Sequence, residues 1–155
     1  MFIRRVTHCH DRKALMAKIL IVDDQACIQE FVSDELIAEG YGVETAGDVK
    51  SVRGYLRFSP PDLILLDLFL DGPEGVSVLQ EIKHQYPELP VIIFTAYDSY
   101  REDPRMSEAD GYVIKSIFLD ELKEKIAHNL KFHQRPDTVA EVQPSVQRVA
   151  GAHGL

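Results

Sequence analysis

Short runs of apolar residues recur along the chain, and longer segments with a different apolar spacing separate them. Three runs are continuous, namely residues 19–22 (ILIV), 63–66 (LILL) and 91–94 (VIIF). A continuous run of this length is typical of a strand that is buried on both faces of a parallel sheet. Val43–Ala46 and Gly111–Ile114 complete a set of five predicted strands.

The segments between these runs carry apolar residues three or four positions apart, which is typical of amphipathic helices. The first predicted helix runs from Gln25 to Glu39 and stops before Gly40, a residue that commonly ends helices. Asp48 is a candidate cap for the second helix, which Pro60-Pro61 ends. The third and last helices have apolar positions at Val76, Leu79, Ile82 and Tyr86, and at Leu119, Leu122, Ile126 and Leu130. Strands that alternate with helices predict an α/β fold, with a parallel sheet covered on both faces.

The segment at 96–110 (AYDSYREDPRMSEAD) fits this alternation least well. It has few apolar residues, and Pro104 lies in its middle. Proline removes a backbone hydrogen bond and clashes with the preceding turn of a helix. We therefore predict a short, irregular or mobile fourth helix.

Both ends of the chain lack this pattern. We expect residues 17–132 to form the domain, 1–16 to be a disordered extension, and the polar segment 133–155 to be a disordered tail with no output domain. Met16 is a plausible alternative start. The HCH triplet at 8–10 has zinc-binding residue types but lacks a fourth ligand, so a solvated arm is favoured over a metal site.

The composition fits one globular domain: 45% of the 155 residues are hydrophobic and 27% are charged. The formal net charge of −8 disfavours direct binding to nucleic acids, whose phosphates an acidic surface repels. Cys9 and Cys27 are too few for a disulfide framework. No apolar run reaches the roughly 18 residues of a membrane span. We expect a cytoplasmic protein with no membrane association.

Residues able to do chemistry follow four of the predicted strands. They are Asp23 and Asp24, then Asp67, Thr95 and Lys115. In open parallel sheets, ligands bind beyond the carboxyl ends of the strands. If the strands at 19–22 and 63–66 are neighbours, three carboxylates meet there. Their repulsion would raise the pKa of a carboxylate or recruit a cation. Oxygen ligands suit Mg²⁺, and together with Lys115 and Thr95 they describe a site for one carboxylate nucleophile and an incoming phosphoryl group.

Each of these residues has an ordinary explanation when it is taken singly. An Asp after a strand is often only the cap of the next helix, a Thr there is often a turn residue, and a Lys in a loop is usually solvated. These explanations do not account for suitable residues at the ends of four strands at once. The joint pattern therefore favours a phosphoryl-transfer site.

Four motifs carry a family resemblance, namely ILIVDD at 19–24, LILLDLFLDGPEG at 63–75, VIIFTA at 91–96 and GYVIKS at 111–116. Together they resemble response-regulator receiver domains, in order and with compatible spacing, over Lys18–Leu130. The resemblance implies a flavodoxin-like, doubly wound, five-stranded parallel sheet in the order 2-1-3-4-5. It also implies a phosphorylation switch of a two-component system or phosphorelay, rather than an enzyme acting on an outside substrate.

The resemblance also implies residue roles. Asp67 would accept the phosphoryl group from a sensor histidine kinase or a histidine phosphotransfer protein. Asp24 and Asp67 would bind Mg²⁺ through their side chains, Phe69 through its backbone carbonyl, and Asp23 mainly through water. The phosphorylated chain, as a monomer or a phosphorylation-linked dimer, would then signal to a partner protein or pass the group onward.

Further roles concern the switch and its timing. Lys115 would pair with the phosphoryl oxygens, Ala96 would leave room for the group, Thr95 would swing toward it, and Tyr112 would turn inward behind Thr95. Phe69 and Tyr97, two positions after the acceptor and after Thr95, would control how water reaches the acyl phosphate. Because both are aromatic, we expect a long-lived phosphoryl state.

Three positions depart from the family pattern. Ser116 follows Lys115 where the family often has proline after a cis bond, so we expect either a trans bond with a shifted loop or a strained cis bond. Asp71 stands where a loop proline is usual, although Gly75 matches the family glycine. Pro104 interrupts the fourth helix, so output contacts cannot be copied from the family.

Other functions fit less well. A haloacid-dehalogenase-type enzyme needs an acid two residues after its nucleophile, where this chain has Phe69. Flavodoxin needs a hydroxyl- and glycine-rich loop where Asp23 and Asp24 stand, and no GxxxxGK[ST] loop is present. After Leu130 too few residues remain for a DNA-binding output domain. The stronger alternative is a receiver-like module that binds proteins without being phosphorylated.

Overall fold

The computed structural model describes residues 17–70 and 74–133. The predicted extension at 1–16, most of the predicted tail and the loop residues 71–73 lie outside the described residues. The expectations for the HCH triplet and for Asp71 therefore stay predictions.

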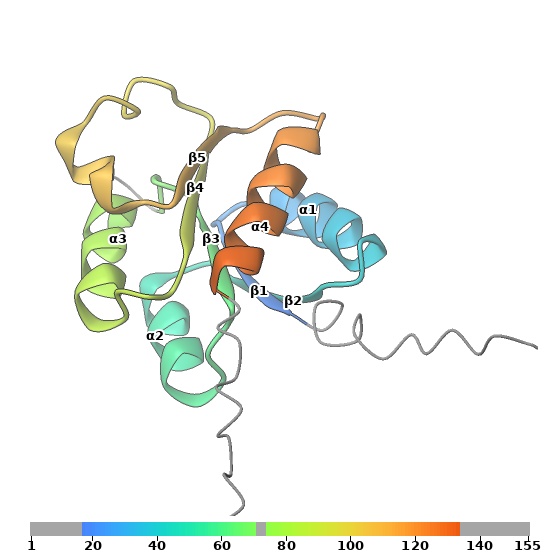
Figure 1. Ribbon diagram of the computed structural model, residues 1–155, viewed down its shortest axis with the longest axis horizontal. Coiled ribbons are helices and arrows are strands. Elements are labelled where there is room, and N and C mark those ends of the chain that lie inside the picture. Colours follow the sequence, from blue (N-terminus) through green and yellow to red (C-terminus); the bar gives the residue numbers. More distant parts are fainter. Residues whose placement is uncertain (1–16, 71–73, 134–155) are drawn as a thin grey trace, which may run out of the picture.

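Five strands form one sheet in the order β2-β1-β3-β4-β5, and every neighbouring pair is parallel (Figure 1). This order confirms the predicted flavodoxin-like sheet. Because β1 lies between β2 and β3, the ends of β1 and β3 lie side by side. The strands are β1 (Lys18–Val22), β2 (Gly42–Ala46), β3 (Leu63–Leu66), β4 (Val91–Thr95) and β5 (Gly111–Ile114).

Helices cover both faces of the sheet, with α2 and α3 on one side and α1 and α4 on the other (Figure 1). The described helices are α1 (Ala26–Ala38), α2 (Val49–Phe58), α3 (Glu74–Gln85), the 3₁₀ helix η2 (Pro104–Glu108) and α4 (Asp120–His133). None of them is both long enough and apolar enough to cross a membrane. The alternation predicted from the apolar pattern is confirmed.

The continuous apolar strands are buried on both sides because successive residues point to opposite faces. In β1, Leu20 and Val22 belong to the core cluster that includes side chains of α2 and α3. Ile19 and Ile21 belong to the cluster that includes side chains of α1 and α4. Full burial of each such side chain stabilises the fold by about 1.5–3 kcal/mol. The sheet is therefore a rigid base for the groups at its ends.

The helix ends expected from the sequence are present. Helix α1 ends at the C-cap Glu39, and Gly40 follows with φ of 94°, a left-handed conformation that favours glycine. The Asp48 side chain accepts a hydrogen bond of 2.7 Å from the backbone N–H of Ser51 at the start of α2.

The segment between β4 and β5 has no α-helix; it contains only the short η2, with Pro104 in its first turn. Asp103 caps η2, and Met106 is buried in the cluster on the α3 side. The prediction of a short, irregular helix is confirmed, since one buried apolar residue gives little reason to form a longer one. The described residues contain no cis peptide bond, so the Lys115–Ser116 bond is trans.

Candidate functional site

The carboxyl ends of the strands bring the candidate residues together, because hydrogen bonding continues one residue beyond the strands. The N–H of Asp23 donates to the carbonyl of Ala46 at 3.0 Å, and the N–H of Asp67 donates to the carbonyl of Val22 at 2.9 Å. On the other side, the N–H of Lys115 donates to the carbonyl of Thr95 at 2.8 Å. The backbones of the acidic residues and of the lysine are thus fixed by the sheet.

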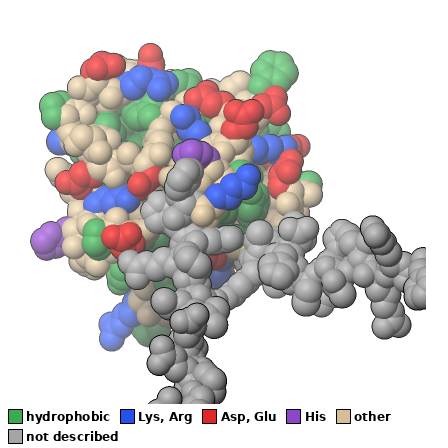
Figure 2. Space-filling view, viewed as in Figure 1, with side chains coloured by type: hydrophobic (Ala, Val, Ile, Leu, Met, Phe, Trp, Pro, Cys, Tyr) green, Lys and Arg blue, Asp and Glu red, His purple; other side chains and the backbone are tan. Residues whose placement is uncertain are grey.

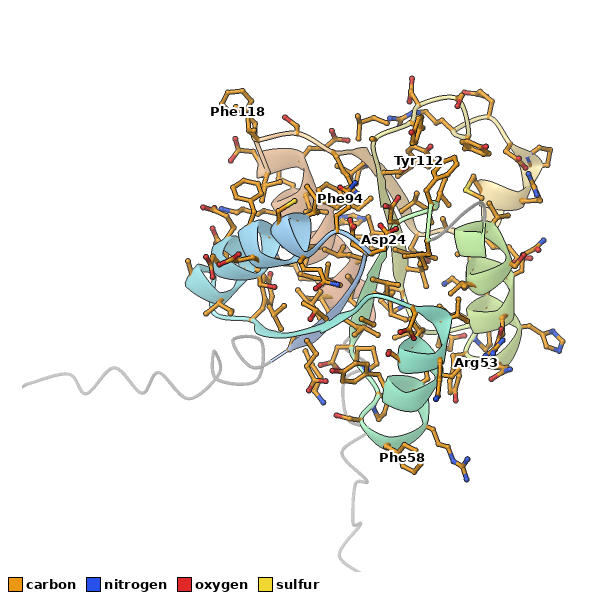
Figure 3. All side chains as sticks on the ribbon, turned by 180° about the vertical axis from the view of Figure 1, so that it is seen from behind. Asp24, Arg53, Phe58, Phe94, Tyr112 and Phe118 are labelled. Atoms are coloured by element: carbon orange, nitrogen blue, oxygen red, sulfur yellow. The ribbon has the colours of Figure 1, made fainter. Side chains whose placement is uncertain are left out.

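Three carboxylates converge at this edge of the sheet. Each of Asp23, Asp24 and Asp67 offers an oxygen, and these oxygens all lie within 4.8 Å of one another. Asp23 and Asp67 are buried, whereas Asp24 is exposed; Figure 3 shows Asp24 at the same end of the sheet as Tyr112. Two unit charges about 4 Å apart repel by roughly 4 kcal/mol at an effective dielectric constant near 20. The cluster therefore needs positive charge.

Lys115 supplies part of that charge. Its Nζ donates a 2.9 Å hydrogen bond to Oδ2 of Asp67 and lies 2.6 Å from Oδ2 of Asp23. Burial raises the pKa of Asp23, and the contacts with Lys115 only partly offset this. Burial alone would lower the pKa of Lys115, but its contacts with Asp23 and Asp67 outweigh burial and raise it. Lys115 is therefore held as a cation between two carboxylates.

One lysine does not satisfy three carboxylates. The buried Oδ2 of Asp23 accepts no hydrogen bond of acceptable geometry, so its contact with Lys115 is an ion pair only. Three clustered carboxylates with one lysine beside them, one carboxylate being exposed, suit Mg²⁺, a hard ion that binds one or two protein carboxylates and keeps several waters. The residues present therefore fit a magnesium ion.

The Asp67 side chain is further positioned by its own loop. The backbone N–H of Phe69 donates to Oδ1 of Asp67 at 3.3 Å. The loop then passes close to the start of α3, where Gly75 donates its N–H to the carbonyl of Leu68 at 3.1 Å. A Cβ at position 75 would lie 2.4 Å from the backbone oxygen of Asp67. Only glycine permits this approach, which explains the glycine noted in the sequence.

A cavity of about 240 Å³ opens beside Asp67, the acceptor expected from the family resemblance, and we call it the acceptor cavity. The residues that line it are Asp24, Gln25, Asp67, Phe69, Ala96, Tyr97 and Lys115. Sequence reasoning missed Gln25, which the pattern indicates only as the start of α1. The exposed Ala96 places no bulky side chain in the cavity. The cavity is thus open to a phosphoryl group.

The remaining predicted residues lie behind or beside this cavity. Thr95 is fully buried, and its Oγ1 accepts a long 3.4 Å hydrogen bond from the N–H of Tyr97. Tyr112 is also buried, and its hydroxyl donates to the carbonyl of Tyr97 at 2.5 Å. The Thr95 hydroxyl therefore makes no hydrogen bond to the side chain of Asp67 or of Lys115 in this structure, while Tyr112 is already turned inward.

Sequence reasoning also missed Tyr100. Its ring meets that of Phe69 edge-on at 5.5 Å between centroids, and Phe69 contacts Tyr97 at 4.5 Å. No motif points to Tyr100, which lies in the irregular segment before η2.

Beyond the acidic cluster, Figure 2 shows acidic and basic side chains interspersed over the visible face, with hydrophobic side chains among them.

The arrangement joins the buried carboxylate of Asp67, a lysine, two further carboxylates suited to Mg²⁺ and an open cavity. Such a site can accept a phosphoryl group, since transfer of this group depends mainly on positioning and charge neutralisation. It carries no side chain placed to act as a proton-transferring acid two residues after Asp67, where Phe69 stands.

Comparison with known proteins agrees with this geometry. The family model described as response regulator receiver domain matches residues 19–127. The response regulator TrrA from Thermotoga maritima, solved in complex with Mg²⁺-BeF, is 38% identical with a TM-score of 0.71, covering 74% of this chain and 99% of TrrA. TrrA was also solved in complex with the histidine kinase ThkA.

A second relative shows the same similarity at lower identity. It is the CheY-like response regulator receiver domain protein from Methanospirillum hungatei, 29% identical with a TM-score of 0.70, covering 76% of this chain and 96% of that protein. Sequence motifs and strand order agree with these matches. The chain belongs to the response regulator receiver domain family of two-component systems.

Proposed function

We propose that this chain is a response regulator that takes a phosphoryl group from phosphohistidine onto Asp67 in a Mg²⁺-dependent reaction. The observation that carries the proposal is the buried Asp67 carboxylate, 2.9 Å from Lys115 and grouped with Asp23 and Asp24. The chain would act in the cytoplasm, which its few cysteines fit. It would be a switch that catalyses only its own phosphorylation and dephosphorylation.

In the proposed reaction, an Asp67 oxygen attacks phosphorus and the bond from phosphorus to the donor imidazole nitrogen breaks. Asp24, Asp67 and the Phe69 carbonyl would hold Mg²⁺, with Asp23 acting through water, and the ion would neutralise charge on the phosphoryl oxygens. Lys115, already fixed beside Asp67, would pair with one of those oxygens. Ala96 would leave space for the group.

The switch would begin at Thr95. Its hydroxyl now accepts only a long bond from the N–H of Tyr97, so little is lost when it turns to donate to a phosphoryl oxygen. Tyr112 already lies buried behind it and would hold the new arrangement. A downstream protein, or a second copy of the chain, would then bind the changed surface near β5.

A histidine kinase or histidine phosphotransfer protein is the proposed donor. An apolar groove of about 250 Å³ lies beside the acceptor cavity, between α1 and the loop after β5. Lys115 lines both hollows. Ile117 and Phe118, both more than 70% exposed, lie in the same loop, and Figure 3 shows Phe118 projecting from the surface. This position suits a helix that delivers its histidine to Asp67.

Incubation with acetyl phosphate and Mg²⁺, followed by intact mass measurement, tests the proposal. Wild type should gain one phosphoryl group, Asp67→Ala should gain none, and Asp34→Ala, which removes an exposed carboxylate of α1, should behave as wild type. Chelation of Mg²⁺ with EDTA should prevent the gain. Uptake that persists in Asp67→Ala would contradict the assignment of the acceptor.

The second candidate is a receiver-like module that works through protein contacts without phosphorylation. It is favoured by the segment between β4 and β5, where η2 replaces a regular helix. A wild-type chain that binds Mg²⁺ but never acquires a phosphoryl group, from acetyl phosphate or from any histidine kinase, would favour this candidate.

A further inference from the structure

The irregular segment between β4 and β5 does more than replace a helix, because its first residues fold back over the acceptor cavity. Tyr97 lines that cavity together with Phe69. Tyr100, three residues further on, also contacts the Phe69 ring, in an edge-on arrangement. We call Phe69, Tyr97 and Tyr100 the aromatic cap. Two loops far apart in sequence thus meet through these rings.

Arg101 ties this cap to the sheet. Its guanidinium lies 4.9 Å from the centre of the Tyr112 ring. Its Nε donates a 2.7 Å hydrogen bond to Oδ1 of Asp98, the residue after Tyr97. The hydroxyl of Tyr112 in turn donates to the carbonyl of Tyr97. The contacts form a closed circuit from Tyr97 through Asp98, Arg101 and Tyr112 back to Tyr97.

The turn itself depends on the same residues. The backbone N–H of Arg101 donates to the carbonyl of Asp98 at 3.0 Å, and the N–H of Asp103 donates to the carbonyl of Tyr100 at 3.0 Å. Tyr100 and Arg101 are consecutive in the chain, and these bonds hold both of them in tight turns. Tyr100 reaches Phe69 on the α3 side, while Arg101 reaches Tyr112 of β5.

We propose that Tyr100 and Arg101 are positioning residues that hold the aromatic cap over the acceptor cavity and thereby slow hydrolysis of the acyl phosphate on Asp67. The proposal rests on the proposed function and adds two residues and a mechanism to it. Arg101 fixes the Tyr97 end of the cap through Asp98 and Tyr112, and Tyr100 supports the Phe69 end. Neither residue lines the acceptor cavity.

The affected step is attack of water on phosphorus. The oxygen of water forms a new bond to phosphorus while the bond from phosphorus to the Asp67 oxygen breaks. The products are the Asp67 carboxylate, hydrogen phosphate and one proton released to solvent. The Phe69 and Tyr97 rings, which line the cavity, restrict the positions from which water can attack phosphorus.

The test measures two quantities in wild type and in Arg101→Ala, Arg101→Lys, Tyr100→Ala and Arg105→Ala. The first is the rate of phosphate loss after loading with acetyl phosphate and Mg²⁺ and removal of the donor. The second, made on the unphosphorylated chain, is the nuclear Overhauser effect between the Phe69 and Tyr97 rings, whose centroids lie 4.5 Å apart. Arg105→Ala is the matched control, because Arg105 pairs with Asp103 in the same segment but stands over no ring among the described residues.

Arg101→Ala should speed phosphate loss about three- to fivefold, as expected from loss of a weak cation–π contact, and should weaken the ring–ring signal. Tyr100→Ala should speed it at least as much. Arg101→Lys, which keeps the cation over Tyr112, should restore most of the wild-type lifetime, and Arg105→Ala should match wild type.

Either of two results would overturn the proposal: an unchanged ring–ring signal in Arg101→Ala, or a weakened signal with unchanged phosphate loss. The same acceleration in Arg105→Ala would also overturn it, since general loosening of the segment would then explain the effect. A wild-type chain that acquires no phosphoryl group overturns the proposed function and the shielding role with it. That failure is distinguishable, because the ring–ring signal is measured without phosphorylation.

Discussion

The two flanks of the acceptor cavity are built differently. On the side of β1 and β3, strand backbones continue their hydrogen bonding to Asp23 and Asp67, and these residues are nearly fully buried. On the side of β4 and β5, Tyr97 and the residues up to η2 form a turn in which side-chain contacts replace regular structure. Tyr97 there is half exposed.

In the proposed function, this difference separates the phosphorylation reaction from the control of how long the phosphoryl group lasts. The acidic cluster is held by a sheet whose position depends on many buried apolar side chains, so single surface changes should not move it. The aromatic cap depends on a few contacts, each worth about 1 kcal/mol or less. Changes near β1 and β3 should therefore affect whether phosphorylation occurs, whereas changes near η2 should affect how long it lasts.

The largest effect is expected at Lys115. Lys115→Ala removes the cation between Asp23 and Asp67, and uptake from acetyl phosphate should fall by about 10²- to 10³-fold, as for other charge-stabilising groups in a transition state. Rates are read by intact mass over time. Lys131→Ala, an exposed lysine of α4, is the control. Equal rates in wild type and Lys115→Ala would show that the lysine has no part in transfer.

Gly75→Ala should have the next largest effect, because its Cβ would meet the Asp67 backbone at 2.4 Å. We expect a loss of about 1–3 kcal/mol in the free energy of unfolding, together with slower uptake as the acceptor loop shifts. Gly54→Ala is the matched control, since nothing lies within 4 Å of its added Cβ. It should be stabilising by about 0.5–1 kcal/mol. Urea unfolding measures the free energy of unfolding of both variants. An unchanged free energy of unfolding in Gly75→Ala would contradict the close approach.

A third prediction separates docking from chemistry. Phe118→Ser should slow phosphotransfer from a histidine kinase about tenfold, as an exposed aromatic anchor would, and leave uptake from acetyl phosphate unchanged. Phe58→Ser removes an equally exposed ring at the end of α2 and should affect neither. Equal loss with both donors would place the effect on the acceptor itself rather than on docking.

The smallest effect concerns Asp103, the cap of η2. Its contacts with Arg105 lower the pKa of Asp103 from 3.8 to about 2. A carboxyl with a lowered folded-state pKa stabilises the fold above its ordinary pKa, and this contribution disappears as the pH falls through about 2. The stability difference between wild type and Asp103→Asn in urea should therefore narrow from pH 5 to pH 2. A difference independent of pH would show that the carboxylate charge is not the cause.

Much of the fold could be predicted because its signals are local. The runs at 19–22, 63–66 and 91–94 are apolar on both faces, and only a covered parallel sheet satisfies them. The strand order came from the family resemblance rather than from periodicity. The irregular segment around Pro104 was predicted for a local reason as well, since proline opposes a regular helix.

Less of the site could be predicted. Asp23, Asp67 and Lys115 each follow a strand, so topology alone brings them together. Gln25, Tyr100 and Arg101 carry no such signal, because their contacts are with residues distant in the chain or arise from the shape of one turn. The roles of the site residues in phosphotransfer stay predictions, with the experiments above as their tests.

The sequence by itself determined the alternation of strands and helices and the set of chemical groups at the strand ends, because hydrophobic periodicity and strand polarity are local properties. Only the tertiary structure decided which neighbours those groups have. It shows that Lys115 bridges Asp23 and Asp67, that Gly75 must lack a side chain, and that Tyr100 reaches Phe69. These facts depend on distances between segments far apart in the chain, which packing fixes and no local pattern encodes.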